Sequence, residues 1–244
     1  PNARPHIVDV NNASDGDILI AYALGLAGKA WGDQRFTMAA AALADSIGEN
    51  LIVEANGRMV LVPGVVGFAP RDRADGALVV NPSYWVFPAL ESIAEFDTSA
   101  NWGEIAVVGE EVLDLSQRAP TYLPPDWMDI ARIKLVPSDK FEPEFGYNAI
   151  RIPLYLALSR NAFRSKRAAD FSSLPGFSSP SGPLVTQVIT GKTREPMGGI
   201  GFRAIAALTE CLDKSTPFPP GLLQIGVDPY YSSTLQIFSV LAIA

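Results

Sequence analysis

Apolar side chains recur at helical spacing in two adjoining stretches near the start of the chain, residues 15–26 and 36–47. Ser14 and Asp15 stand where the N-cap of the first helix is expected, and Gly28 interrupts the pattern between the two stretches. The short connection predicts that the two helices pack antiparallel as a hairpin.

A β-hairpin is predicted directly after this helical pair. Residues 51–54 and 58–62 are strand-like and flank Asn56 and Gly57, a pair that favours the left-handed backbone of a tight turn. Helical spacing then returns in six further segments, at residues 82–96, 102–116, 148–159, 162–171, 199–212 and 229–242. The pattern therefore predicts eight helices, mostly in pairs, with one small β excursion.

Three long stretches rich in Gly and Pro separate the later helices, at residues 63–81, 120–147 and 174–198. They are too long for simple connectors, so we expect them to build a site on the helical scaffold. Helical hairpins in series form either a solenoid or a closed ring, and the lack of a repeating residue period counts against a regular solenoid. We therefore predict an all-α protein, a single domain over residues 1–244 that forms an α/α toroid of helical hairpins.

Composition and charge exclude several classes of function. The 244 residues carry a formal net charge of −7, which argues against a nucleic-acid partner. No apolar run reaches the roughly 18 residues of a membrane-spanning helix, so membrane insertion is not expected. Cys211 is the only cysteine, which rules out an intrachain disulfide and a thiolate zinc cluster. His6 is the only histidine and lies in a Pro-flanked N-terminal stretch, so a histidine-dependent triad is disfavoured and no metal site is evident.

Polar and aromatic residues gather at three predicted helix starts, in residues 11–17, 81–85 and 148–151. Each group also has a plain structural interpretation: Asp15 as a helix cap, the aromatic pair as core, and Arg151 as a surface ion-pair residue. If the three helix starts meet at one end of a ring, they form a polar, aromatic-lined cleft. Such a cleft suits a polysaccharide.

The same regions carry a family resemblance. The matching segments, in chain order, are Asn12-Ala13-Ser14-Asp15-Gly16-Asp17, Ile20-Ala21-Tyr22-Ala23-Leu24, Trp31-Gly32, Asn81-Pro82-Ser83-Tyr84, Gly146-Tyr147-Asn148-Ala149-Ile150-Arg151-Ile152-Pro153-Leu154 and Tyr230-Tyr231-Ser232-Ser233. They resemble glycoside hydrolase family 8, and most of all the endoglucanases (cellulases) associated with bacterial cellulose synthesis. The resemblance implies an inverting, endo-acting glycosidase with an (α/α)6 barrel. It also implies β-1,4-glucan as substrate, no cofactor, and a periplasmic or secreted location.

The resemblance also implies roles for individual residues. Asp15 matches the aspartate that hydrogen-bonds the sugar at the point of cleavage, and Tyr84 and Arg151 match residues that line the same subsite. One of Tyr230 and Tyr231 matches a tyrosine that helps to hold the attacking water. Asn12 and Tyr147 of the matching segments are also expected to bind substrate, as is Trp85, the second member of the aromatic pair with Tyr84.

Asn148 departs from the pattern of many family members, which have an aspartate there as the general base. An amide cannot accept a proton from water as a carboxylate does, so Asn148 could position the water without deprotonating it. Either the base lies elsewhere or the residue was changed to trap an inactive enzyme. Asp15, Glu142 and Glu144 are the candidates for the base, with Asp15 preferred.

The general acid of the family is a glutamate in an N-terminal segment that precedes everything matched here. Inverting hydrolysis needs two carboxyl groups about 6.5–9.5 Å apart. We therefore expect the chain to be a fragment, with the acid-bearing remainder still bound to it as a separate chain. The alternatives are an inactive carbohydrate-binding or scaffold protein of the same fold, or a family 8 hydrolase acting on xylan, chitosan or mixed-linkage glucan.

Overall fold

The computed structural model describes residues 11–130 and 141–244, so His6 lies outside the described residues. Helices dominate this part of the chain, as predicted. The α-helices are α1 (Ser14–Trp31), α2 (Gln34–Leu51), α3 (Phe87–Ile93), α4 (Trp102–Ser116), α5 (Arg151–Leu158), α6 (Ala162–Asp170), α7 (Ile200–Lys214) and α8 (Tyr230–Leu241). Short 3-10 turns are η1 (Pro70–Asp72), η2 (Pro82–Tyr84), η3 (Phe171–Ser173) and η4 (Pro220–Leu222). Each of the eight predicted helical segments contains one α-helix, but the segment 82–96 divides into η2 and α3, and α5 begins at Arg151 rather than at residue 148.

The first helical hairpin, α1 and α2, is confirmed, but two details of the prediction are wrong: the N-cap of α1 is Ala13 rather than Ser14 or Asp15, and the helix continues through Gly28 to Trp31. Gly32 ends α1 in the left-handed conformation, with φ of 64°, and the Asp33 side chain accepts a hydrogen bond from the Arg35 backbone N–H at the start of α2. A Cβ on Gly28 would lie 2.3 Å from the Thr37 hydroxyl, so this glycine permits the close approach of the two helices.

The predicted β-hairpin is also confirmed. Strands β1 (Ile52–Ala55) and β2 (Arg58–Leu61) pair antiparallel, with Ile52 opposite Leu61. Asn56 and Gly57 form the turn between them with φ of 53° and 74°. The positive φ at both positions matches the twist of the strands, which is why this sequence pair was a reliable signal.

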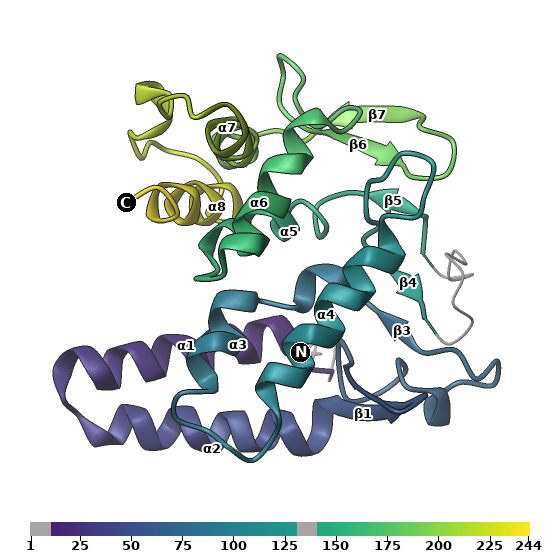
Figure 1. Cartoon of the computed structure of the whole chain (residues 1–244), viewed down its shortest axis with the longest axis vertical. Coiled ribbons are helices and arrows are strands. Elements are labelled where there is room, and N and C mark those ends of the chain that lie inside the picture. The colour runs from purple at the N-terminus through teal and green to yellow at the C-terminus, as the bar shows by residue number, and fades with distance from the viewer. Residues whose placement is uncertain (1–10, 131–140) are drawn as a thin grey trace, which may run out of the picture.

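The long Gly- and Pro-rich stretches contain strands that the sequence did not predict. Strand β3 (Val79–Val80) pairs with β4 (Met128–Asp129), and a three-stranded antiparallel sheet joins β5 (Glu144–Phe145), β6 (Leu184–Gln187) and β7 (Thr193–Pro196). Strands of two to four residues are too short to show an alternating pattern. In Figure 1 the labelled strands lie on the right of the molecule, and the connection between α1 and α2 lies on the left.

The helical pairs follow one another without closing into a ring. Helix α3 packs against α1, α4 and α5, α5 packs against α6, α7 and α8, and α7 packs against α8. The α1–α2 hairpin and the α7–α8 pair lie at opposite ends of this series (Figure 1). The prediction of paired helices is therefore correct, but the described part of the chain does not show the closed toroid.

A buried arginine joins three of the helices. The Arg164 guanidinium on α6 contacts Glu91 of α3 at 2.6 Å and Glu110 of α4 at 2.7 Å, and it lies 4.5 Å from the centre of the Phe87 ring. Only 7 % of the Arg164 side chain is exposed. The ion pairs thus link helix α6 to α3 and α4.

Replacing Arg164 with alanine is expected to lower the free energy of unfolding by about 3 kcal/mol, because the partly buried Glu110 would lose its cation and Glu91 would keep only the more distant Arg160. Urea unfolding followed by circular dichroism measures the change. Arg58→Ala is the matched control, since Arg58 and Glu111 form an ion pair with side chains 56 % and 43 % exposed. That change should cost less than about 1 kcal/mol, and equal losses for the two variants would contradict the prediction.

Candidate active site

The N-terminal ends of α1, η2 and α5 meet, as the sequence predicted for the helix starts. Asp15 lies in the first turn of α1 and Arg151 is the first residue of α5. Arg151 Nη1 lies 2.5 Å from Asp15 Oδ2, and each side chain is only 11 % exposed. The α1 N-cap, Ala13, makes no side-chain cap bond, so Asp15 serves this ion pair rather than capping the helix.

The turn η2 presents Ser83 and Tyr84 to the same guanidinium. Arg151 Nη2 donates to the Ser83 hydroxyl at 2.8 Å, and the guanidinium lies 5.4 Å from the centre of the Tyr84 ring. Asn81 holds this turn by accepting hydrogen bonds from the Ser83 N–H and hydroxyl. Burial raises the pKa of Tyr84, so its hydroxyl stays protonated at neutral pH and can donate or accept a hydrogen bond.

Asn148 lies between this arginine and a second carboxylate. Its Oδ1 accepts from Arg151 Nη2 at 3.0 Å, and its Nδ2 donates to Asp126 Oδ2 at 3.4 Å. Position 148 is therefore part of the Asp15–Arg151 cluster, as the resemblance implied. The amide at this position has no proton-accepting group comparable to a carboxylate.

The two C-terminal tyrosines have different environments. Tyr231 donates its hydroxyl proton to the Tyr147 carbonyl oxygen at 2.6 Å, and both rings contact Phe202 edge-on, with centroid distances of 5.8 and 5.6 Å. Burial raises the pKa of Tyr231, while the positive charge of Arg151 acts on it in the opposite direction. Tyr230 is 86 % exposed. Of the two alternatives for the water-holding tyrosine, the structure therefore places Tyr231 near the cluster.

Two other predicted substrate-binding residues have structural partners. Trp85 is 1 % exposed and its indole N–H donates to the Ile105 carbonyl at 3.0 Å, so of its two interpretations the structure supports the core one. Asn12 donates to Asp17 at 2.6 Å and accepts from the Val65 N–H at 3.0 Å. These bonds hold the loop after β2 against the start of α1.

The candidate bases differ in their positions. Both Asp15 oxygens are engaged, Oδ2 with Arg151 and Oδ1 with the Gly16 N–H at 2.8 Å. Glu144 lies on β5, where Arg194 of β7 contacts it at 2.8 Å, and burial raises its pKa. Glu142 is exposed. Of the three, Asp15 is the one that contacts the Arg151 cluster.

Asp126 is the main residue of the site that the sequence analysis missed. It is 8 % exposed, and burial raises its pKa. Its neighbour Trp127 stacks between Phe68 and Phe141, with ring centroids 5.8 and 4.4 Å away. The only feature of the sequence that could have indicated Asp126 is its position next to Trp127, because no periodic pattern surrounds this pair in the stretch 120–147.

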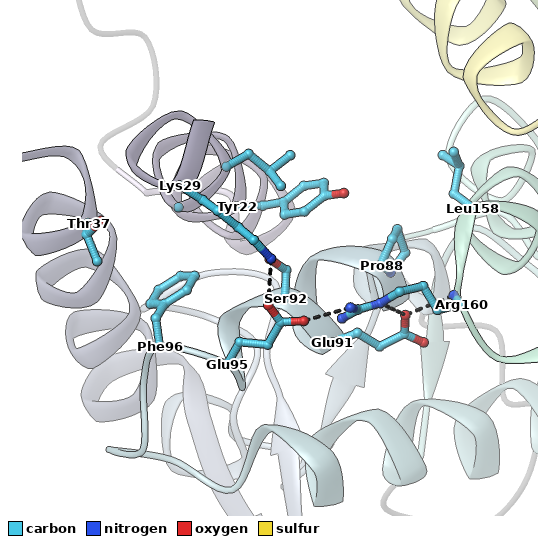
Figure 2. Close-up of a pocket in the computed structure, with 12 residues that line it drawn as sticks. Tyr22, Lys29, Thr37, Pro88, Glu91, Ser92, Glu95, Phe96, Leu158 and Arg160 are labelled. Carbon is cyan, nitrogen blue, oxygen red and sulfur yellow. Dashed lines mark hydrogen bonds and ion pairs between the residues drawn. The ribbon is translucent and has the colours of Figure 1, made fainter. Parts of the chain in front are cut away.

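A separate pocket of about 410 Å³ lies along the later turns of α1 (Figure 2). Lys29 and Arg160 contact Glu95 at 3.8 and 2.6 Å, and Arg160 lies 3.7 Å from Glu91. None of the predicted site residues lines this pocket, so it is distinct from the Arg151 cluster. Within residues 11–130 and 141–244, no group of three or more His, Cys, Asp or Glu side chains could hold a metal ion.

Comparison with known proteins places the chain in the class of glycoside hydrolases. More particularly, the chain belongs to family 8 of the glycosyl hydrolases, whose family model matches residues 2–244. None of the described helices is long and apolar enough to cross a membrane.

Individual relatives agree with this family. The chain is 39 % identical over 158 residues to an endoglucanase of Cellulomonas uda, covering 64 % of this chain and 43 % of the relative. It is 30 % identical over 242 residues to a probable endoglucanase of Novacetimonas hansenii, covering 98 % of this chain and 68 % of the relative. The crystal structure of a Klebsiella pneumoniae family 8 endoglucanase is 34 % identical with a TM-score of 0.82, and the match covers 100 % of this chain and 76 % of that one.

Proposed function

We propose that the protein is an endo-acting glycoside hydrolase that cleaves β-1,4-glucan. The observation that carries the proposal is the Asp15–Arg151 ion pair, which joins the starts of α1 and α5 beside the Tyr84 ring in a member of family 8. The relatives named as endoglucanases support the choice of substrate. An enzyme acting on an exported glucan would work in the periplasm or outside the cell.

The chemistry follows from the groups in the cluster. Asp15 accepts hydrogen bonds only, so its carboxylate can bind a sugar hydroxyl and support distortion of the ring at the cleavage point. Arg151 holds that carboxylate in place, and the Tyr84 and Tyr231 hydroxyls supply further hydrogen bonds. The same proposal has three further parts. They are an inverting reaction, a glutamate as general acid, and an (α/α)6 barrel to which this chain contributes helical hairpins. The comparisons give no support to the expected companion fragment.

A carbohydrate-binding protein without turnover is the second candidate, and Asn148 is the observation that favours it. The amide occupies a position next to Arg151 where many family members have their basic aspartate. A protein with this amide and no substitute base would retain the sugar-binding groups and lose hydrolysis.

Reducing-sugar release from a soluble cellulose derivative, measured together with the fall in viscosity, tests the proposal. An endo-acting enzyme lowers the viscosity steeply for each reducing end formed. Xylan, chitosan and mixed-linkage glucan are the comparison substrates, and faster cleavage of one of them would reassign the substrate. Binding of cello-oligosaccharides without any product would establish the second candidate.

A further inference from the structure

The Asp126 carboxylate is held by the backbone segment that leads into α5. Its Oδ1 accepts hydrogen bonds from the Gly146 N–H at 3.0 Å and the Ala149 N–H at 2.7 Å. The Asp126 N–H in turn donates to the Glu144 carbonyl at 2.7 Å. A Cβ on Gly146 would lie 2.8 Å from Asp126 Oδ2, so a glycine is needed for this close approach.

The second oxygen of Asp126 fixes the orientation of the Asn148 amide. Asn148 Nδ2 faces Asp126 Oδ2 at 3.4 Å, while Asn148 Oδ1 faces Arg151 Nη2 at 3.0 Å. Rotating the amide by half a turn would place two donors together at Arg151 and two acceptors together at Asp126. The charged groups on either side therefore permit one orientation only.

These contacts form a continuous series from one carboxylate to another. Asp126 accepts from Asn148, Asn148 accepts from Arg151, and Arg151 pairs with Asp15 at 2.5 Å. At each contact a hydrogen-bond donor of one side chain faces an acceptor of the next. We name this series of four side chains the Asp126–Asp15 relay.

We propose that Asp126 is a positioning residue of this site, which sets the orientation of the Asn148 amide and, through it, of the Arg151 guanidinium. The inference rests on the proposed function insofar as the relay serves hydrolysis. Among the described residues no cation contacts Asp126 directly, and the carboxylate accepts hydrogen bonds from N–H groups of the segment 146–149. In the described part of the chain these donors match its charge.

The isosteric variant Asp126→Asn separates this role from simple support of the loop. The asparagine Oδ1 still accepts from the two backbone N–H groups, so the segment stays anchored. Its Nδ2 now faces Asn148 Nδ2, and whichever way Asn148 turns, one donor faces another donor. The double variant Asp126→Asn with Asn148→Asp restores every hydrogen bond, because the new carboxylate accepts from both neighbours.

The test is a double-mutant cycle on positions 126 and 148, with kcat and KM measured on a soluble cellulose derivative. With Asn148 in place, Asp126→Asn should lower kcat about tenfold to a hundredfold and change KM by less than about threefold. With Asn148→Asp in place, the same change should not lower kcat. Asp45→Asn, the same chemical change on an exposed part of α2, is the control. An equal loss in both backgrounds would overturn the proposal, and so would failure of both Asp126→Asn proteins to fold.

A measurement that does not depend on turnover tests the relay separately from the proposed function. The Asn148 side-chain NH2 signal in a 15N NMR spectrum is identified by its loss in Asn148→Asp. We expect this signal to move in Asp126→Asn and to stay in place in Asp45→Asn. If no protein hydrolyses glucan and the signal moves, the proposed function fails and the relay stands. A signal that does not respond to Asp126→Asn refutes the relay, whatever the activity.

Discussion

Replacing Asp15 with alanine should lower kcat/KM for soluble cellulose by about a hundredfold or more. The change removes the carboxylate that we propose binds the sugar at the cleavage point, and it leaves the Arg151 guanidinium, 11 % exposed, without its ion-pair partner. A guanidinium released in this way moves toward Ser83 and Asn148, which disturbs the remaining contacts of the cluster. Misplacement of a catalytic group by about 1 Å can cost a factor of this size.

Asp17→Ala is the matched control for Asp15. Asp17 lies in the same helical turn, but its carboxylate accepts from Asn12 at 2.6 Å rather than from Arg151. The Asp17→Ala variant should therefore keep kcat/KM within a few-fold of the value for the unchanged protein. Circular dichroism and the midpoint of thermal unfolding establish that both variants are folded. A folded Asp15→Ala protein with nearly unchanged kcat/KM would exclude Asp15 from the machinery.

Replacing Asn148 with aspartate should raise kcat about a hundredfold or more. The new carboxylate would occupy the position at which the family resemblance implies a basic aspartate, and a positioned general base contributes roughly 10²–10⁴ to the rate. Its contact with Arg151 would persist, because a carboxylate oxygen accepts from the guanidinium as the amide oxygen does. Asn148→Ala is the control, and it should show no gain.

The pH dependence of Asn148→Asp gives a second, sharper measurement. Asp126 would then face another carboxylate across the present 3.4 Å contact, and burial already raises the pKa of Asp126. Like charges at this distance raise the pKa at which the pair loses its last proton. Since the base works only when ionised, kcat should rise with pH through a midpoint above the ordinary aspartate value of about 4. Unchanged turnover at every pH would show that the base lies elsewhere.

The helices could be predicted from the sequence because each buries one face and so repeats its apolar residues. Helix α4 matches its predicted range, residues 102–116, and the turn at Asn56 and Gly57 was identified from two residues alone. The sheets of the long stretches could not be predicted, because strands such as β3 and β5 have two residues each. Their pairing depends on partners distant in the chain.

The site was predictable only where residues lie at helix starts. The regions of Asp15, Tyr84 and Arg151 were expected to meet at one end of the helices, and the structure brings them together, but the sequence did not predict the ion pair between Asp15 and Arg151. Asp126 lies 23 positions before its backbone partner Ala149, in a stretch without periodicity, so its role depends on the folded loop. For Trp85 the sequence suggested a binding role that the structure does not support, because an aromatic residue next to a site residue can belong to the core.

The Asp15–Arg151 contact also determines at which stage of folding the site can form. The two residues are 136 positions apart, so the contact closes most of the described chain into one loop. Forming such a contact costs far more chain entropy than forming a helical turn, and long-range contacts of this kind slow folding. Helices α1 and α5 can each form early from local interactions, but neither contains a site by itself. Binding competence should therefore appear together with the final docking of distant segments, as one of the last properties that the folding chain acquires.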